Sequence, residues 1–189
     1  MNADLLVYQA KAFYNAYIAL DQLSRDDSDT LLLLFAPLVV NGAFSVELAL
    51  KAILAKNQIE YGKEHNLLIL FQMLPKSFQQ ELWAYLIEKA PEYAGSEKGL
   101  DELILLSNAF VDWRYAFEGK PVPAIESRFL AAFANAAVHT MFSYYNVDLL
   151  PATKTESNNE IEQRFHENRE KCKEINLKMI QKKTKEHQL

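Results

Sequence analysis

The amino-acid sequence predicts an all-α protein, and three observations support this fold class. Half of the 189 residues are hydrophobic and 12% are aromatic, so the chain can bury enough apolar surface to offset the entropy lost on folding. Only five Gly and six Pro are present, whereas an all-β chain of this length needs many turns that use both residues. Apolar residues also recur at helical spacing through long stretches of the chain.

The N-terminal part of the sequence predicts two helices. Residues 3–24 place apolar side chains near 3.6-residue spacing, which indicates a helix with a broad apolar face. Polar residues 25–30 interrupt the pattern, and their Asp and Ser side chains can cap a second helix that ends near Lys56. Pro37 removes one backbone donor, so this helix either bends there or becomes regular near that residue. Apolar residues between 40 and 54 cover most of its circumference, which predicts a central helix.

Four further stretches show helical spacing, and Pro, Gly or polar residues separate them. We therefore expect four more helices in the core. They lie at residues 67–74, 78–87, 100–117 and 125–149.

The composition changes to charged and polar from Lys154 onward. Its sparse apolar residues form one narrow stripe, which predicts a charged amphipathic helix with a frayed end. We divide the chain accordingly into a helical bundle at 1–153 and an extension at 154–189. Such a helix buries little on its own, so we expect it to pack on the core or on a second copy.

The charge distribution argues against binding of extended duplex DNA. Residues 1–155 hold 12 Lys and Arg against 18 Asp and Glu, whereas residues 156–189 hold 8 against 7. A surface that binds duplex phosphates needs clustered Lys and Arg, and the acidic core offers no such stripe.

Several features favour a cytoplasmic protein that does not enter a membrane. The single Cys172 cannot form an intrachain disulfide, which fits a reducing compartment. The N-terminus shows neither the basic start nor the apolar stretch of a signal peptide. The most apolar run, residues 31–40, is followed by Asn41 and Glu47 and is too short to span a bilayer.

We expect neither a metal nor a cofactor. The four His are dispersed along the chain, and they do not form the close ligand spacings of a zinc site with the lone Cys. The sequence also contains no phosphate-cradling Gly-rich loop, no Gly-x-Ser-x-Gly turn and no His-Glu-x-x-His helix.

Three motifs follow one another along the chain: the Glu47/Lys51 pair on an apolar helix, the Gly62-x-x-His65 turn, and the helix end Arg114-Tyr115-x-Phe117-Glu118. Together they resemble the HEPN family (higher eukaryotes and prokaryotes nucleotide-binding) in order and spacing. The resemblance covers roughly residues 5–150. It implies an up-and-down helical bundle that pairs with a second copy. The family includes RNA-cleaving toxins, phage-defence proteins and partners of small nucleotidyltransferases.

The resemblance also implies how an RNA-cleaving member would work. In that branch an Arg is followed four to six residues later by a His, and two subunits bring these pairs together to cleave a phosphodiester without metal. Here Arg114 is followed by Tyr-Ala-Phe-Glu-Gly-Lys-Pro, so no imidazole stands there to transfer protons. We therefore place the chain in the branch that lacks the ribonuclease motif.

Glu47 and Lys51 stand one helical turn apart in an apolar stretch, so their side chains can pair. In the structural interpretation, which we favour, they form an ion-pair network with Arg114 that fixes how two helices dock. In the functional interpretation, they line a small polar pocket for a nucleotide phosphate or similar anion. A guanidinium near a helix end can hold phosphate through two hydrogen bonds, which makes Arg114 the best functional candidate. Tyr115, which could stack on a base, and Glu118, which could neutralise Arg114, complete the candidate set.

Two histidines are also candidates. The ring of His65 either caps the apolar helix after it or hydrogen-bonds to the second helix; as a base it would need a nucleophile or phosphate nearby. We expect His139, on the last core helix, to be a satisfied core or interface side chain, with contact to Arg114 as the alternative. The aromatic residues Trp113, Tyr115 and Phe117 could stack on a base, but alternating helical aromatic residues are more often core.

Two functions from different classes follow. The first is a non-catalytic HEPN-type homodimer that binds a partner protein, such as a nucleotidyltransferase, or a nucleotide, in a phage-defence or toxin–antitoxin setting. The second is a metal-independent endoribonuclease in which Arg114 stabilises the phosphate and His65 or His139 transfers protons. We prefer the first because it explains the missing His and the acidic core.

Overall fold

The computed structural model describes residues 3–25, 28–94, 97–114 and 124–146, which all belong to the unit Met1–Leu149. The predicted all-α class is confirmed, since these residues form a helical bundle without a strand. The predicted domain boundary near residue 153 and the C-terminal helix lie outside the described residues. The elements are α1 (Ala3–Ser24), α2 (Ser28–Lys56), α3 (Leu67–Met73), α4 (Lys76–Lys89), the 3₁₀ helix η1 (Pro91–Tyr93), α5 (Glu97–Leu106), α6 (Ala109–Arg114) and α7 (Ser127–Tyr145).

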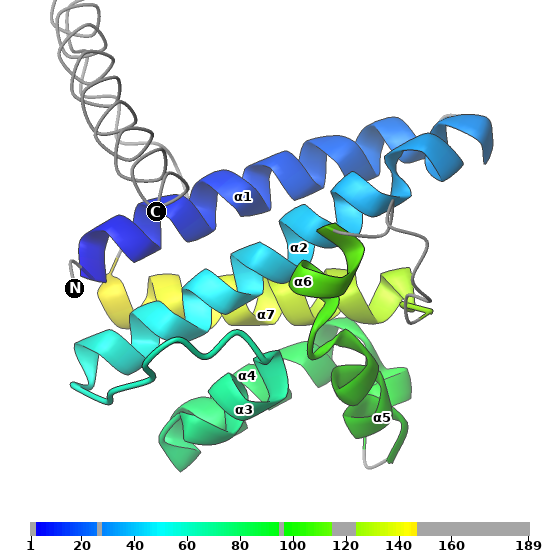
Figure 1. The fold of residues 1–189 in the computed structure, drawn as a ribbon. Helices are drawn as coiled ribbons and strands as arrows, with labels where there is room; N and C mark the ends of the chain where they lie inside the picture. Colours follow the sequence, from blue (N-terminus) through cyan, green and yellow to red (C-terminus); the bar gives the residue numbers. More distant parts are fainter. Residues whose placement is uncertain (1–2, 26–27, 95–96, 115–123, 147–189) are drawn as a thin grey trace, which may run out of the picture. The chain divides into compact units, whose positions relative to one another are not determined.

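Helix α2 is the centre of the bundle, as its apolar circumference predicts. It packs against α1 and α7, which run beside it, and also against α3 and α6 (Figure 1). Ala49, Leu50 and Ile53 are fully buried within it. Pro37 lies inside α2 and is exposed, so the helix is formed on both sides of that residue.

Gly42 lets α1, α2 and α7 approach closely. A Cβ atom placed on Gly42 would stand 3.0 Å from Cδ2 of Tyr17 and 3.1 Å from Cδ1 of Leu130. Tyr17 and Leu130 are themselves buried, and burial raises the pKa of the Tyr17 hydroxyl above its usual range. Both side chains are enclosed in the core, so the close contact depends on glycine.

We expect Gly42→Val to lower the free energy of unfolding by about 1–3 kcal/mol, because the added side chain overpacks this contact. Urea unfolding followed by circular dichroism measures the change. Ala19→Val on the exposed face of α1 is the control and should cost less than about 1 kcal/mol, the helix-propensity difference. Equal stability of the Gly42 variant and the wild type would contradict the close approach.

The prediction of one continuous helix at residues 100–117 is wrong, because α5 ends at Leu106 and α6 begins at Ala109. Tertiary contacts cause the break. The carbonyl of Ser107 accepts a 2.7 Å hydrogen bond from the backbone N–H of Leu67, while the Ser107 hydroxyl donates to the carbonyl of Ile104. The carbonyl of Asn108 then starts the hydrogen bonding of α6.

The segment Leu33–Lys56 of α2 is long and apolar enough to cross a membrane by length and composition alone. More than half of its most apolar window is buried inside the bundle. The core helix of a soluble domain passes the same test, and α2 has the burial of such a helix.

Candidate functional site

The first part of the candidate site lies on α2, where Glu47 and Lys51 occupy successive turns. The Nζ atom of Lys51 donates a 2.7 Å hydrogen bond to Oε1 of Glu47. Glu47 is 1% exposed and Lys51 is 8% exposed. Charges this deeply buried are tolerated only when each has a partner, so Glu47 and Lys51 each make the burial of the other possible.

His65 reaches this pair from the loop that connects α2 and α3. The loop reverses direction with positive φ angles of 57° at Gln58 and 56° at Gly62. The Oε1 atom of Glu64 accepts the backbone N–H groups of His65 and Asn66, which fixes the chain just before α3. The side chain of Asn66 caps α3 by accepting from the backbone N–H of Ile69. His65 is therefore held in place by its neighbours and does not cap α3.

The His65 ring bonds across to α2, which is one of the two roles expected from the sequence. Its Nδ1 atom lies 2.8 Å from Oε1 of Glu47, the same oxygen that accepts from Lys51. A carboxylate can only accept, so Nδ1 carries the proton and the other ring nitrogen, Nε2, is the one left for other contacts. The His65 side chain is 51% exposed. Glu47 thus joins a buried cation to a half-exposed imidazole.

The second carboxylate oxygen of Glu47 has a different environment. Oε2 is buried and has no hydrogen-bond partner among the described residues. Lys51 also lies 5.4 Å from the centre of the Tyr61 ring, and burial, followed by the charge of Glu47, raises the pKa of the Tyr61 hydroxyl. A shallow pocket of about 380 Å³ opens beside Tyr61, and Glu60 is the charged residue that lines it. The pocket therefore presents negative charge, which disfavours a phosphate.

Arg114 stands at the C-terminal end of α6, and its guanidinium lies 4.8 Å from the centre of the Phe110 ring. Phe110 stacks on Phe44 of α2, with ring centres 4.2 Å apart, which docks α6 on the central helix. The opposite end of α6 follows Asn108, whose side chain accepts from Asn66, the neighbour of His65. Arg114 follows Asn108 by six residues, so its backbone lies roughly 9 Å along the helix axis from the end of α6 that contacts the His65 loop.

The sequence also singled out Tyr115, Glu118, His139 and Trp113. Tyr115 and Glu118 lie outside the described residues. His139 stacks on Tyr85 of α4, with ring centres 4.0 Å apart and planes inclined by 15°. Its Nδ1 atom is buried without a hydrogen-bond partner among the described residues. Trp113 packs edge-on against Phe35, as expected for a core aromatic residue.

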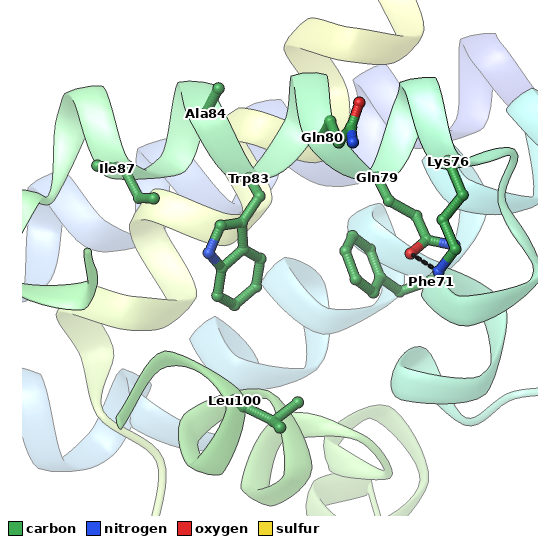
Figure 2. Close-up of a pocket in the computed structure, with 8 residues that line it drawn as sticks. All are labelled: Phe71, Lys76, Gln79, Gln80, Trp83, Ala84, Ile87 and Leu100. Carbon is green, nitrogen blue, oxygen red and sulfur yellow. Dashed lines mark hydrogen bonds between the residues drawn. The ribbon is translucent and has the colours of Figure 1, made fainter. Parts of the chain in front are cut away.

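A groove of about 580 Å³ between α4 and α5 was not found by sequence reasoning. Figure 2 shows the rings of Trp83 and Phe71 inside it and Leu100 on the facing helix. Leu100 is 48% exposed although it belongs to an apolar stretch. The sequence signal for this groove is the apolar composition of α5, where Leu100, Ile104 and Leu105 are exposed. These residues can be recognised as surface residues only once the buried face of the helix is known.

Within the described ranges, no group of three or more His, Cys, Asp and Glu side chains is arranged to hold a metal ion.

The fold and the site define an all-helical bundle whose central helix buries a Glu/Lys pair that binds a histidine from the next loop. Residues 36–127 match the family model of the HEPN domain, so this stretch of the chain is similar to a HEPN domain. The match begins within α2 and ends at the first residue of α7, a shorter stretch than the sequence resemblance suggested. Comparison with curated proteins and with solved structures gave no match.

Proposed function

We propose that this protein is a non-catalytic HEPN-type module that forms a homodimer in the cytoplasm and binds a partner protein. The proposed setting is a phage-defence or toxin–antitoxin system, in which a nucleotidyltransferase is the type of partner that the family suggests. A partner protein is favoured over a nucleotide because Lys51 is already neutralised and the pocket beside it carries Glu60.

The observation that carries the proposal is the shared oxygen of Glu47. Lys51 and His65 both bind Oε1, so the carboxylate uses its charge to fix the loop between α2 and α3 on the central helix. Arg114 lies further along α6 and rests on Phe110. A ribonuclease needs an imidazole and a cation that converge on one phosphate, whereas His65 lies on the loop before α3 and Arg114 lies at the C-terminal end of α6.

One observation supports the second candidate, a metal-independent endoribonuclease. A buried carboxylate that holds Nδ1 of a half-exposed imidazole leaves Nε2 directed to other contacts, an arrangement that general bases use. In this mechanism His65 of one subunit would transfer the proton while Arg114 of a second subunit would stabilise the phosphate. His139 is less suited, because it is stacked on Tyr85.

RNA cleavage by the purified full chain tests the proposal. Wild type, Arg114→Ala and His65→Gln are incubated with single-stranded RNA and a chelator, and light scattering on the same samples reports the mass. We expect intact RNA for all three proteins and a dimeric mass for the wild type. Cleavage that is lost in both variants would make the protein a ribonuclease. Cleavage at the same rate in all three would indicate a contaminating nuclease, and the preparation would be repeated.

A further inference from the structure

We infer that the groove between α4 and α5 is a docking site for a helical segment of the partner protein, which inserts large apolar side chains at one end and places a carboxylate on Lys76 at the other. This inference rests on the proposed function as a binding module and adds the surface and the chemistry of the partner.

The groove follows one flank of α4. Its lining residues on that helix include Lys76, Gln79, Trp83 and Ile87, which recur every three or four positions and so share one side (Figure 2). From Lys76 to Ile87 this flank is roughly 16 Å long, about three helical turns. The groove is open to solvent along its length. An open trough of this length covers one side of a helix, whereas a small molecule is usually enclosed on most of its surface.

The apolar end is built around Trp83. Its ring lies 5.9 Å from that of Phe71, and the two planes are inclined by 46°. Gly99 permits the approach of α5, because a Cβ atom there would stand 2.9 Å from Cζ2 of Trp83. Leu100 closes this end and remains 48% exposed, and Ile104, one turn further on the same flank, is 49% exposed. Half-buried aromatic rings beside exposed aliphatic side chains are typical of a protein-binding site.

The other end of the groove carries an uncompensated positive charge. The side-chain amide of Gln79 donates to the carbonyls of Gln72 and Leu74, and its oxygen accepts from Nζ of Lys76 at 3.1 Å. Gln79 is therefore fixed in position and holds Lys76 at the groove. No carboxylate lines the groove, and Lys76 forms no ion pair among the described residues. Charge complementarity therefore requires an acidic partner residue at this end.

The geometry sets the spacing of the partner's side chains. Lys76 and Trp83 are roughly 10 Å apart along α4, which equals about seven residues of a partner helix. The partner segment thus carries an Asp or Glu two turns away from a Leu, Ile, Met or aromatic residue. A membrane surface fits less well, because the protein is acidic overall and anionic headgroups would be repelled.

A phage-displayed library of alanine-based helical peptides of about 16 residues tests this inference, since peptides of that length span the groove. The full-length wild-type chain is the bait. We expect the enriched peptides to share a large apolar residue and an acidic residue about seven positions apart. Fluorescence anisotropy with the most enriched peptide then measures affinity for Leu100→Glu, which should bind at least about tenfold more weakly.

Leu105→Glu is the matched control. Leu105 belongs to the same helix and is 43% exposed, but it lies on the opposite flank of α5 from Leu100. We expect this variant to bind like the wild type, and equal unfolding midpoints for the two variants would show that both are folded. Lys76→Glu should lower the affinity for the acidic peptide a few-fold and raise the affinity for a peptide with Lys in place of the acidic residue.

Three results would overturn the inference: no enriched consensus, equal binding by Leu100→Glu and Leu105→Glu, or a charge preference unchanged by Lys76→Glu. A fall from dimeric to monomeric mass in Leu100→Glu alone would also overturn it, because the occupant would then be a second copy. RNA cleavage does not enter this test. A protein that cleaves RNA and still selects the acidic peptides would refute the non-catalytic proposal and leave the docking site standing.

Discussion

Replacement of Glu47 by alanine should lower the free energy of unfolding by about 3–5 kcal/mol, the range for breaking a buried ion pair at one partner. The variant leaves Lys51, which is 8% exposed, as a buried cation without its carboxylate. It also releases His65, whose bond to Glu47 fixes the loop on the central helix. Urea unfolding of the full chain, followed by circular dichroism, measures the loss.

Two further variants separate the buried pair from the loop contact. His65→Gln removes the half-exposed partner and should cost far less, about 1 kcal/mol, because Lys51 still neutralises Glu47. The double variant Glu47→Met/Lys51→Met replaces both charges by apolar groups of similar volume and should be near neutral or stabilising. If Glu47→Ala costs no more than His65→Gln, Lys51 does not depend on Glu47, and the interpretation of the pair as a mutually neutralised core element is wrong.

Replacement of Phe133 by alanine should also lower the free energy of unfolding by about 3–5 kcal/mol, the range for removing a buried aromatic ring. Phe133 of α7 is fully buried. Its ring stacks on Phe129 with centres 5.6 Å apart and meets Phe71 of α3 edge-on at 6.2 Å. The substitution therefore opens a cavity where α7 supports α3, and unfolding in urea again gives the magnitude.

Leu105→Ala is the control for this prediction, because Leu105 is an apolar residue with 43% exposure. It should change stability by no more than about 0.5 kcal/mol. Since Phe71 also lines the groove, Phe133→Ala should weaken binding of the selected peptide, whereas Phe133→Leu, which keeps most of the volume, should retain most of it. A loss below about 1 kcal/mol for Phe133→Ala would show that the ring is not a principal contact of the core.

The difference between predicted and observed helices follows from the range of the forces involved. Residues 3–24 and the helix that ends at Lys56 were predicted closely, because helical periodicity and capping are set by neighbouring residues. The helix expected at 100–117 failed at Ser107, whose carbonyl bonds to Leu67, a residue far away in the sequence. No local pattern contains that contact, so a continuous helix was the natural expectation.

The same distinction applies to the candidate site. The pairing of Glu47 with Lys51 follows from the sequence alone, because residues four apart on a helix share one face. The role of His65 had two alternatives, and the reversal at Gly62 together with the Glu64 contacts selects the bond to α2. The participation of Arg114 in a functional site stays a prediction that the RNA assay tests.

By itself, the sequence determined the helical class, the central position of α2 and the buried pair on it, since each depends on spacing within one helix. The tertiary structure decided which loop residue meets Glu47 and where the helix after residue 97 breaks. It also decided that Trp83 and Leu100 form two walls of one groove. These features arise only when helices that are distant in the sequence pack together. The need for glycine at position 99, for example, comes from Trp83 of α4, which lies against α5 at that point.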